Sequence, residues 1–132
     1  MPTHAVVEPV QGERIAGFGA PDPMVGNILP SQGWRYQAPA GEPVVATAPG
    51  VVAFADWFQG YGNLIILEHG GGTSTLYAHL DLMRVSPGEF VEGGTSIGTA
   101  GTSGATSEAG LYFQVRREGQ PVDPVTWLTD AQ

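Results

Sequence analysis

The sequence predicts an all-β domain built on an antiparallel sheet, and two observations carry this prediction. The 20 glycines and 11 prolines make up more than a fifth of the 132 residues. In a helix interior a glycine costs about 1 kcal/mol and a proline about 3 kcal/mol relative to alanine, so long helices are not expected. Six short runs rich in β-branched and aromatic residues, each bounded by Gly, Pro or Ser, predict strands instead.

The elements follow in chain order. We expect residues 1–30 to form a loop-rich lead-in with room for one short strand, because glycine and proline recur throughout. Residues 31–128 form the predicted domain, and 129–132 form a tail. The predicted strands span residues 42–48, 50–57, 63–69, 74–80, 89–94 and 111–117.

The third and fourth runs predict a hairpin joined by the three glycines at 70–72. A turn centred there places His79 opposite Leu64, with His69 roughly 17 Å along the ladder at 3.4 Å per residue. The two histidines therefore cannot share a metal ion. His4 lies in the lead-in, so the sequence offers one well-placed imidazole.

A faint internal repeat relates residues 40–52 to residues 87–98, each reading Gly-Glu-x-Val followed by a turn. Two copies of such a unit favour a sandwich in which one hairpin packs against the other. A similarity this short also arises by chance, so the repeat leaves both explanations open.

Composition excludes several function classes. The net charge is −8, and the five basic residues are all arginine. Nucleic-acid binding needs clustered Lys and Arg, so no nucleic-acid partner is expected. The absence of lysine excludes a P-loop at the glycine-rich segment 98–106, and the absence of cysteine excludes disulfides. No apolar run approaches the ~18 residues that a membrane-spanning helix needs.

The run at 111–117 alternates two kinds of side chain. Leu111, Phe113 and Val115 point to one face, as core residues do. Tyr112 and Gln114 point to the other face, together with Arg116. This row of a phenol, an amide and a guanidinium predicts a surface that grips a partner.

The residues alone give no recognisable catalytic set. A zinc hydrolase needs three protein ligands and an open position, and the histidines do not supply them. A pair of glycosidase carboxylates stays open on spacing alone, although solvated turn carboxylates are commoner. The candidates are Asp56, Glu68, Asp81, Glu89, Glu92 and Asp123.

Four stretches carry a resemblance to a known family. They are "APAGEPVVATAPGVVAFAD", "GYGNLIILEHGGGTSTLYAHL", "VSPGEFVEGGTSIGTAGTSG" and "LYFQVRREGQPVDPVTWL". Together they resemble the LytM or lysostaphin-type metallopeptidase domain, a zinc endopeptidase that cuts peptidoglycan cross-links. The resemblance implies an antiparallel β-sheet sandwich, the duplicated hybrid motif, with an open groove.

The sequence departs from the family at the metal site. Active members carry His-x-x-x-Asp and His-x-His motifs, which fall here on Ser31 and Arg35 and on Gly110 and Tyr112. Ser31, Arg35 and Tyr112 thus stand at the ligand positions, and His79 remains alone at a catalytic-histidine position. A guanidinium there would repel a divalent cation by on the order of several kcal/mol. The resemblance therefore implies a degenerate peptidase with no metal, no cofactor and no catalysis.

These substitutions resemble those of EnvC-like murein hydrolase activators. That family implies a partner, an N-acetylmuramoyl-L-alanine amidase, activated in the Gram-negative periplasm during cell division. Its N-terminal coiled coil, which would link to a divisome membrane complex, and an export signal are both missing from this sequence. We expect the partner-binding groove to contain Gln32, Arg35, Leu64, Tyr77, His79, Tyr112, Gln114 and Arg116.

Tyr112 and Arg116 are the expected anchors, because tyrosine and arginine are enriched in binding hot spots. Three other interpretations stay open. Tyr77 and Tyr112 could be packing residues and Arg116 a solvated strand charge. The domain could be a module that binds peptidoglycan itself, or a divergent zinc endopeptidase that uses His79 with unforeseen ligands.

Overall fold

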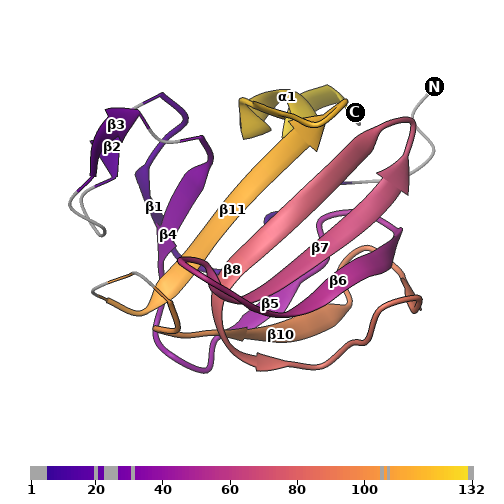
Figure 1. The fold of residues 1–132 in the computed structure, drawn as a ribbon, viewed down its shortest axis with the longest axis horizontal. Coiled ribbons are helices and arrows are strands. Elements are labelled where there is room, and N and C mark those ends of the chain that lie inside the picture. The colour runs from indigo at the N-terminus through magenta and orange to yellow at the C-terminus, as the bar shows by residue number, and fades with distance from the viewer. Residues whose placement is uncertain are drawn as a thin grey trace.

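The computed structural model of the protein describes residues 6–19, 21–22, 27–30, 32–104, 106 and 108–130. Its main sheet is antiparallel, in the order β1-β4-β11-β8-β7-β6-β9 (Figure 1). The strands of this path are β1 (Glu13–Ala16), β4 (Trp34–Gln37), β11 (Gly110–Arg117), β8 (Thr73–Met83), β7 (Gly62–Gly70), β6 (Gly50–Phe58) and β9 (Phe90–Val91). The predicted all-β, antiparallel fold is confirmed.

Further strands complete the architecture. β10 (Ser96–Ala100) pairs with β5 (Pro43–Val45) and with β8, and β12 (Gln120–Val122) pairs with β11. β2 (Pro21–Asp22) and β3 (Asn27–Pro30) form a separate two-stranded sheet, and α1 (Pro124–Asp130) follows β12. β5 and β10 cross beneath the long strands in Figure 1. In the described part of the chain no helix is long and apolar enough to span a bilayer.

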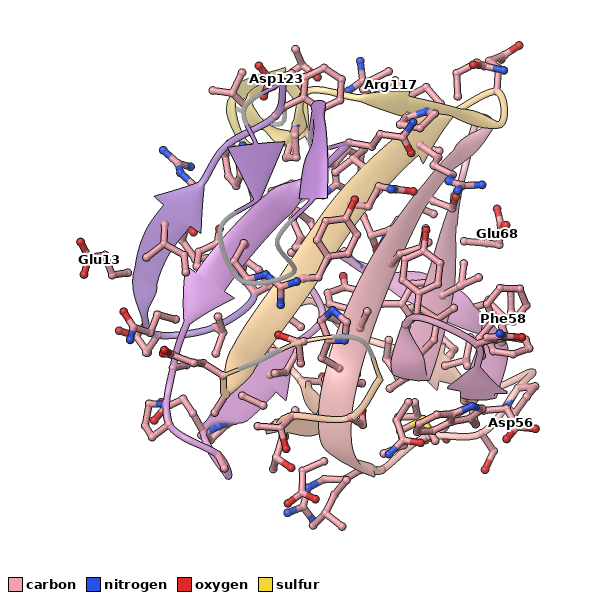
Figure 2. All side chains as sticks on the ribbon, turned by 60° about the vertical axis from the view of Figure 1, so that its left-hand side comes forward. Glu13, Asp56, Phe58, Glu68, Arg117 and Asp123 are labelled. Atoms are coloured by element: carbon pink, nitrogen blue, oxygen red, sulfur yellow. The ribbon has the colours of Figure 1, made fainter. Side chains whose placement is uncertain are left out.

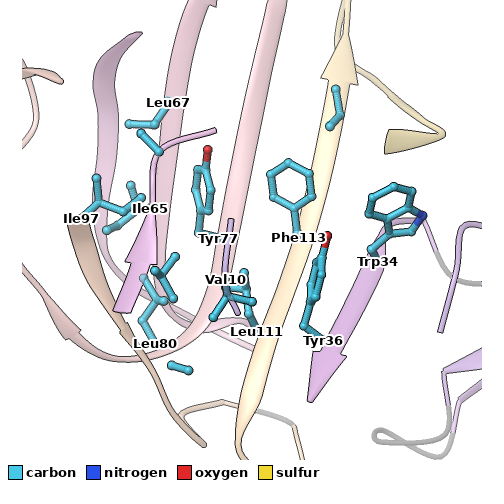
Figure 3. Close-up of a cluster of buried hydrophobic side chains, with 14 of the residues drawn as sticks. Val10, Trp34, Tyr36, Ile65, Leu67, Tyr77, Leu80, Ile97, Leu111 and Phe113 are labelled. Carbon is cyan, nitrogen blue, oxygen red and sulfur yellow. The ribbon is translucent and has the colours of Figure 1, made fainter. Parts of the chain in front are cut away.

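The main core lies between the long strands and the β5–β10 pair. Ile65 and Leu67 of β7, Tyr77 of β8 and Phe113 of β11 are all fully buried in it (Figure 3). They alternate along their strands with residues that point to the opposite face, as the period of two requires. Tyr77 and Phe113 lie directly opposite each other in the ladder, with ring centroids 5.4 Å apart.

The predicted β7–β8 hairpin forms. Gly70, Gly71 and Gly72 make its turn with φ of 88°, 64° and 81°, a conformation that glycine adopts without steric cost. Further along, Ile65 pairs with Tyr77 and Asn63 pairs with Leu80. Two residues of β8 therefore face one of β7, which is a β-bulge at Ala78–His79 opposite Leu64.

The structure corrects the expected element list. The lead-in, predicted as loop with one short strand, contains β1, β2 and β3, and β1 belongs to the main sheet through its pairing with β4. β4, β10, β12 and α1 were not predicted. Their segments are three to seven residues long, so each is held by pairing or packing partners distant in sequence rather than by its own pattern.

Candidate functional site

The face of β6, β7, β8 and β11 that points away from the main core is called the outer face here. Leu64, Leu76 and Ala78 form a second, smaller apolar cluster on it, and all three are buried. Partly buried side chains pack against this cluster from the neighbouring strands and the β6–β7 turn: Phe54, Tyr61, Ile66 and Tyr112.

The polar row predicted on β11 lies on this face and is linked by hydrogen bonds. Gln114 is fully buried. Its Nε2 donates to the Tyr112 hydroxyl at 2.8 Å, and Arg116 Nε donates to Gln114 Oε1 at 2.6 Å. Because the buried amide holds both neighbours, the phenol and the guanidinium are fixed relative to each other.

Arg35 of β4 lies beside this row, since it pairs with Tyr112 across the ladder. Its side chain is buried, and Nη2 lies 3.2 Å from Nε2 of His79, while Nη1 donates to Thr106 Oγ1 at 3.3 Å. The guanidinium carbon lies 5.8 Å from the centroid of the Tyr112 ring. Residues far apart in sequence therefore meet at one point of the outer face.

The two bonds of His79 define its tautomer. Nδ1 lies 2.8 Å from the carbonyl oxygen of Ser103, which can only accept, so Nδ1 carries a proton. A guanidinium can only donate, so Nε2 must accept from Arg35 with its lone pair. The pair of bonds fits the neutral ring protonated on Nδ1.

The backbone around His79 is also fixed. His79 has φ of 67°, the left-handed region that few non-glycine residues adopt, and its amide donates to the Tyr61 carbonyl at 2.8 Å. Ser103 Oγ donates to the Leu80 carbonyl at 2.6 Å and accepts from the Asn63 amide at 3.0 Å. The bulge and the loop at Ser103 thus hold the imidazole in one orientation.

These side chains do not fit a zinc ion. Arg35, which the family resemblance places at a ligand position, presents a fixed positive charge and no lone pair. It also occupies the Nε2 lone pair of His79, the nitrogen that a metal or a proton-transfer step would need. Among the described residues no group of three or more His, Cys, Asp or Glu side chains could hold a metal ion.

An aromatic chain extends from Tyr112 to the edge of the sheet. Ring centroids of Tyr112 and Tyr61 lie 6.1 Å apart, those of Tyr61 and Phe58 6.0 Å, and those of Phe58 and Phe54 6.1 Å. Phe58 is 52% exposed at the β6–β7 edge, where Figure 2 labels it near Asp56. Of these aromatic residues, Tyr61, Phe58 and Phe54 were not among the predicted site residues, although the run "DWFQGYG" at 56–62 holds two of them.

The structure brings six of the eight predicted site residues together on the outer face: Arg35, Leu64, His79, Tyr112, Gln114 and Arg116. Gln32 is exposed and precedes Gly33, where an added Cβ would lie 2.9 Å from the Tyr112 hydroxyl. Ser31 lies outside the described residues.

The placement of Tyr77 in the groove is corrected by the structure. Tyr77 lies in the main core, because its strand neighbours Leu76 and Ala78 take the outer face. Its hydroxyl is hydrogen-bonded to the Thr47 amide and hydroxyl, both at 3.1 Å, and to the Thr75 hydroxyl at 2.8 Å. Burial raises the pKa of this phenol. Tyr77 is therefore a packing residue.

Comparisons with known proteins agree with this fold. The family model described as Peptidase family M23 matches residues 29–124. The chain is 39% identical over 120 residues to murein hydrolase activator EnvC of Escherichia coli, covering 91% of the chain and 28% of EnvC. It is 38% identical over 121 residues to murein hydrolase activator NlpD of Salmonella dublin, covering 91% of the chain and 30% of NlpD.

A relative named as an enzyme also matches. The chain is 43% identical over 94 residues to DD-carboxypeptidase/endopeptidase Mpg of Neisseria meningitidis serogroup B, covering 71% of the chain and 22% of Mpg. The chain thus spans less than a third of the length of each of these relatives.

A solved structure shares the fold. The catalytic domain of the antimicrobial peptidase lysostaphin from Staphylococcus simulans superposes with a TM-score of 0.79 at 30% identity, covering 89% of this chain and 92% of that one. The matched segment, the relatives and the shared fold lead to one conclusion. The chain belongs to peptidase family M23, the LytM family that the sequence predicts.

Proposed function

We propose that this chain is a catalytically inactive LytM domain that binds and activates an N-acetylmuramoyl-L-alanine amidase. The amidase would hydrolyse peptidoglycan in the periplasm of a Gram-negative cell during cell division. Similarity to two proteins named as murein hydrolase activators supports the coarse role.

The bond between Arg35 and His79 carries the proposal. A buried guanidinium 3.2 Å from Nε2 of the one histidine retained at a family catalytic position blocks both metal binding and proton transfer there. The surrounding face presents the partly buried apolar side chains of Phe54 and Ile66 next to a fixed phenol and guanidinium, which suits the recognition of a protein segment.

The proposed mechanism is a population shift in the amidase. The outer face binds a segment that otherwise blocks the amidase active site, and so favours the open state. A binding partner shifts such an equilibrium only by its difference in affinity for the two states, so the segment must be accessible only in the open state.

A divergent zinc endopeptidase is the second candidate, and the similarity to Mpg favours it. It requires Arg35 to leave His79 and other residues to supply ligands. A domain of this kind would cleave peptidoglycan with zinc and without any amidase.

The test is the release of dye from labelled peptidoglycan by an amidase alone, by the full chain alone with zinc, and by both together. We expect no release by the chain alone and faster release by the mixture. Tyr112→Ala should reduce the stimulation, because it removes the side chain that joins the polar row to the aromatic chain.

The matched control is Val125→Ala, which truncates an exposed side chain on α1. It should stimulate the amidase as the unmodified chain does. Dye release by the chain alone would establish the peptidase instead, and an unchanged rate in every mixture would rule out the activator.

A further inference from the structure

The outer face has an electrostatic polarity across its strands. In the ladder Arg116 of β11 lies opposite Ser74 of β8, and Ser74 lies opposite Glu68 of β7. The three side chains therefore share one face, with the small serine in the middle. Neighbouring strands lie about 4.8 Å apart, so the Cα atoms of Arg116 and Glu68, two strands apart, are separated by about 10 Å.

On either side of the Ser74 position the outer face carries opposite charges. Arg35 and Arg116 lie on the β4–β11 side, whereas Glu68 and Asp56 lie on the β7–β6 side, where Figure 2 labels both acids. Glu68 is exposed. The two neighbouring arginines stand out because the chain as a whole has a net charge of −8.

The guanidinium of Arg116 is held in an orientation that can bind an anion. Its Nε is bound to buried Gln114, which fixes the plane of the guanidinium. Within the described part of the chain no ion pair or further hydrogen bond uses its two terminal nitrogens. A guanidinium held in this way can bind a carboxylate with both terminal nitrogens at once.

The surface between the arginines and the acids is apolar. In the next row of the ladder Gln114 lies opposite Leu76, which lies opposite Ile66, and Phe54 follows on β6. Gln114 and Leu76 are buried, so the apolar side chains that an occupant can contact are the partly buried Ile66 and Phe54. An occupant must therefore present apolar side chains in its middle. A peptidoglycan stem peptide offers carboxylates but little apolar surface, so the apolar middle favours a protein segment.

We propose that the outer face binds a protein segment in one orientation, with a carboxylate seated on Arg116, apolar side chains over Ile66 and Phe54, and a basic side chain facing Glu68. This inference rests on the proposed function, in which the segment belongs to an amidase. It adds the chemistry of the segment and the direction in which it lies.

The experiment measures the affinity of the full chain for the amidase with four variants. Arg116→Glu and Glu68→Arg should each weaken binding at least about tenfold, as loss of an anchor does. The double variant R116E/E68R keeps the net charge but reverses the polarity, and it should stay weak. Arg84→Glu, an exposed arginine that follows β8, should bind within about twofold of the unmodified chain.

Two further measurements locate the carboxylate. Arg116→Lys should bind more tightly than Arg116→Glu and more weakly than the unmodified chain, because it keeps the charge but loses the donor to Gln114. In the amidase, each Asp and each Glu is replaced by Arg, one at a time. One of these replacements should restore binding to the Arg116→Glu variant.

The outcomes separate the two proposals. The unmodified chain could bind and activate the amidase while Arg116→Glu or the double variant binds equally well. In that case the proposed orientation is wrong and the proposed activator function is retained. If the unmodified chain does not bind the amidase, both proposals are wrong. If purified muropeptides bind and compete at Arg116, the occupant is peptidoglycan and the inference is overturned.

Discussion

At the scale of single residues, one substitution changes the chemistry of the site. An aspartate at position 35 would offer a metal two oxygens, whereas Arg35 offers five N–H donors and a permanent charge. Its bond to Nε2 converts His79 from a potential base into a fixed acceptor. The Arg35–His79 bond therefore supports the proposal that this site binds a partner rather than cleaving a substrate.

This arrangement predicts the tautomer of His79. We expect neutral His79 to carry its proton on Nδ1, because Nδ1 faces the Ser103 carbonyl and Nε2 faces a donor. Nitrogen-15 NMR of the ring should show a protonated Nδ1 and an unprotonated Nε2. Arg35→Leu should release Nε2 from this constraint. A proton on Nε2 in the unmodified chain would show that the Arg35 bond does not form.

The sequence anticipated the row of Tyr112, Gln114 and Arg116 correctly, because a period of two assigns faces within one strand. It failed for Tyr77, since which face of β8 meets the core depends on the β-bulge and on pairing with β7. The aromatic residues Phe54, Phe58 and Tyr61 were also missed, because the sequence does not show which side chains meet in the folded sheet. Phe54 and Phe58 lie on the same strand, but Tyr61 meets Phe58 only through the β6–β7 turn.

At the scale of elements, β4 lies very close to the start of β11. A Cβ added at Gly110 would overlap the Tyr36 carbonyl oxygen, so no side chain fits there unless the backbone shifts. Gly110 is the residue that the family resemblance aligns with a catalytic histidine. The site is therefore closed to that side chain by strand packing as well as by substitution.

Gly110→Ala should lower the free energy of unfolding by about 1–3 kcal/mol, the range for overpacking a well-packed site. The matched control is Gly17→Ala, because an added Cβ there has no heavy atom within 4 Å. It should change the stability by less than about 0.5 kcal/mol. Equal stabilities of the two variants in urea titrations would contradict the close approach of β4 and β11.

The long strands β6, β7, β8 and β11 were predictable because each is at least eight residues long and carries several apolar, aromatic or β-branched residues. β4 and β10 were not, since their four or five residues carry too little pattern of their own. They form because β11 and β8 offer edges for pairing. The position of β1 was not predicted either, because its four residues lie in a glycine-rich lead-in and form a strand by pairing with β4.

At the scale of the whole molecule, two buried phenols link stability to pH. Burial, together with the hydrogen bond to Glu8, raises the pKa of Tyr36 above its usual value. Burial also raises the pKa of Tyr77. Because the folded-state values exceed those of the unfolded chain, the neutral phenols stabilise the fold fully below pH 10.0, the ordinary tyrosine value.

Stability should therefore fall as pH rises above about 10, by up to about 1.4 kcal/mol per pH unit for each of these phenols. Urea unfolding measured from pH 8 to about 11.5 checks this. Tyr36→Phe should reduce the slope, because it removes one of the two groups. The same slope in both proteins would show that Tyr36 is not protected from ionisation.

The proposed function assigns the contact with the amidase to the outer face. Hydroxyl-radical footprinting of the full chain with and without amidase tests it most directly, because it reports the exposure of side chains. We predict protection of Phe58, Tyr61 and Tyr112 on the outer face, and no change at Leu82 or at Val125 on α1. Protection at Leu82 or Val125, with Phe58 and Tyr112 still reactive while the amidase is activated, would contradict the claim.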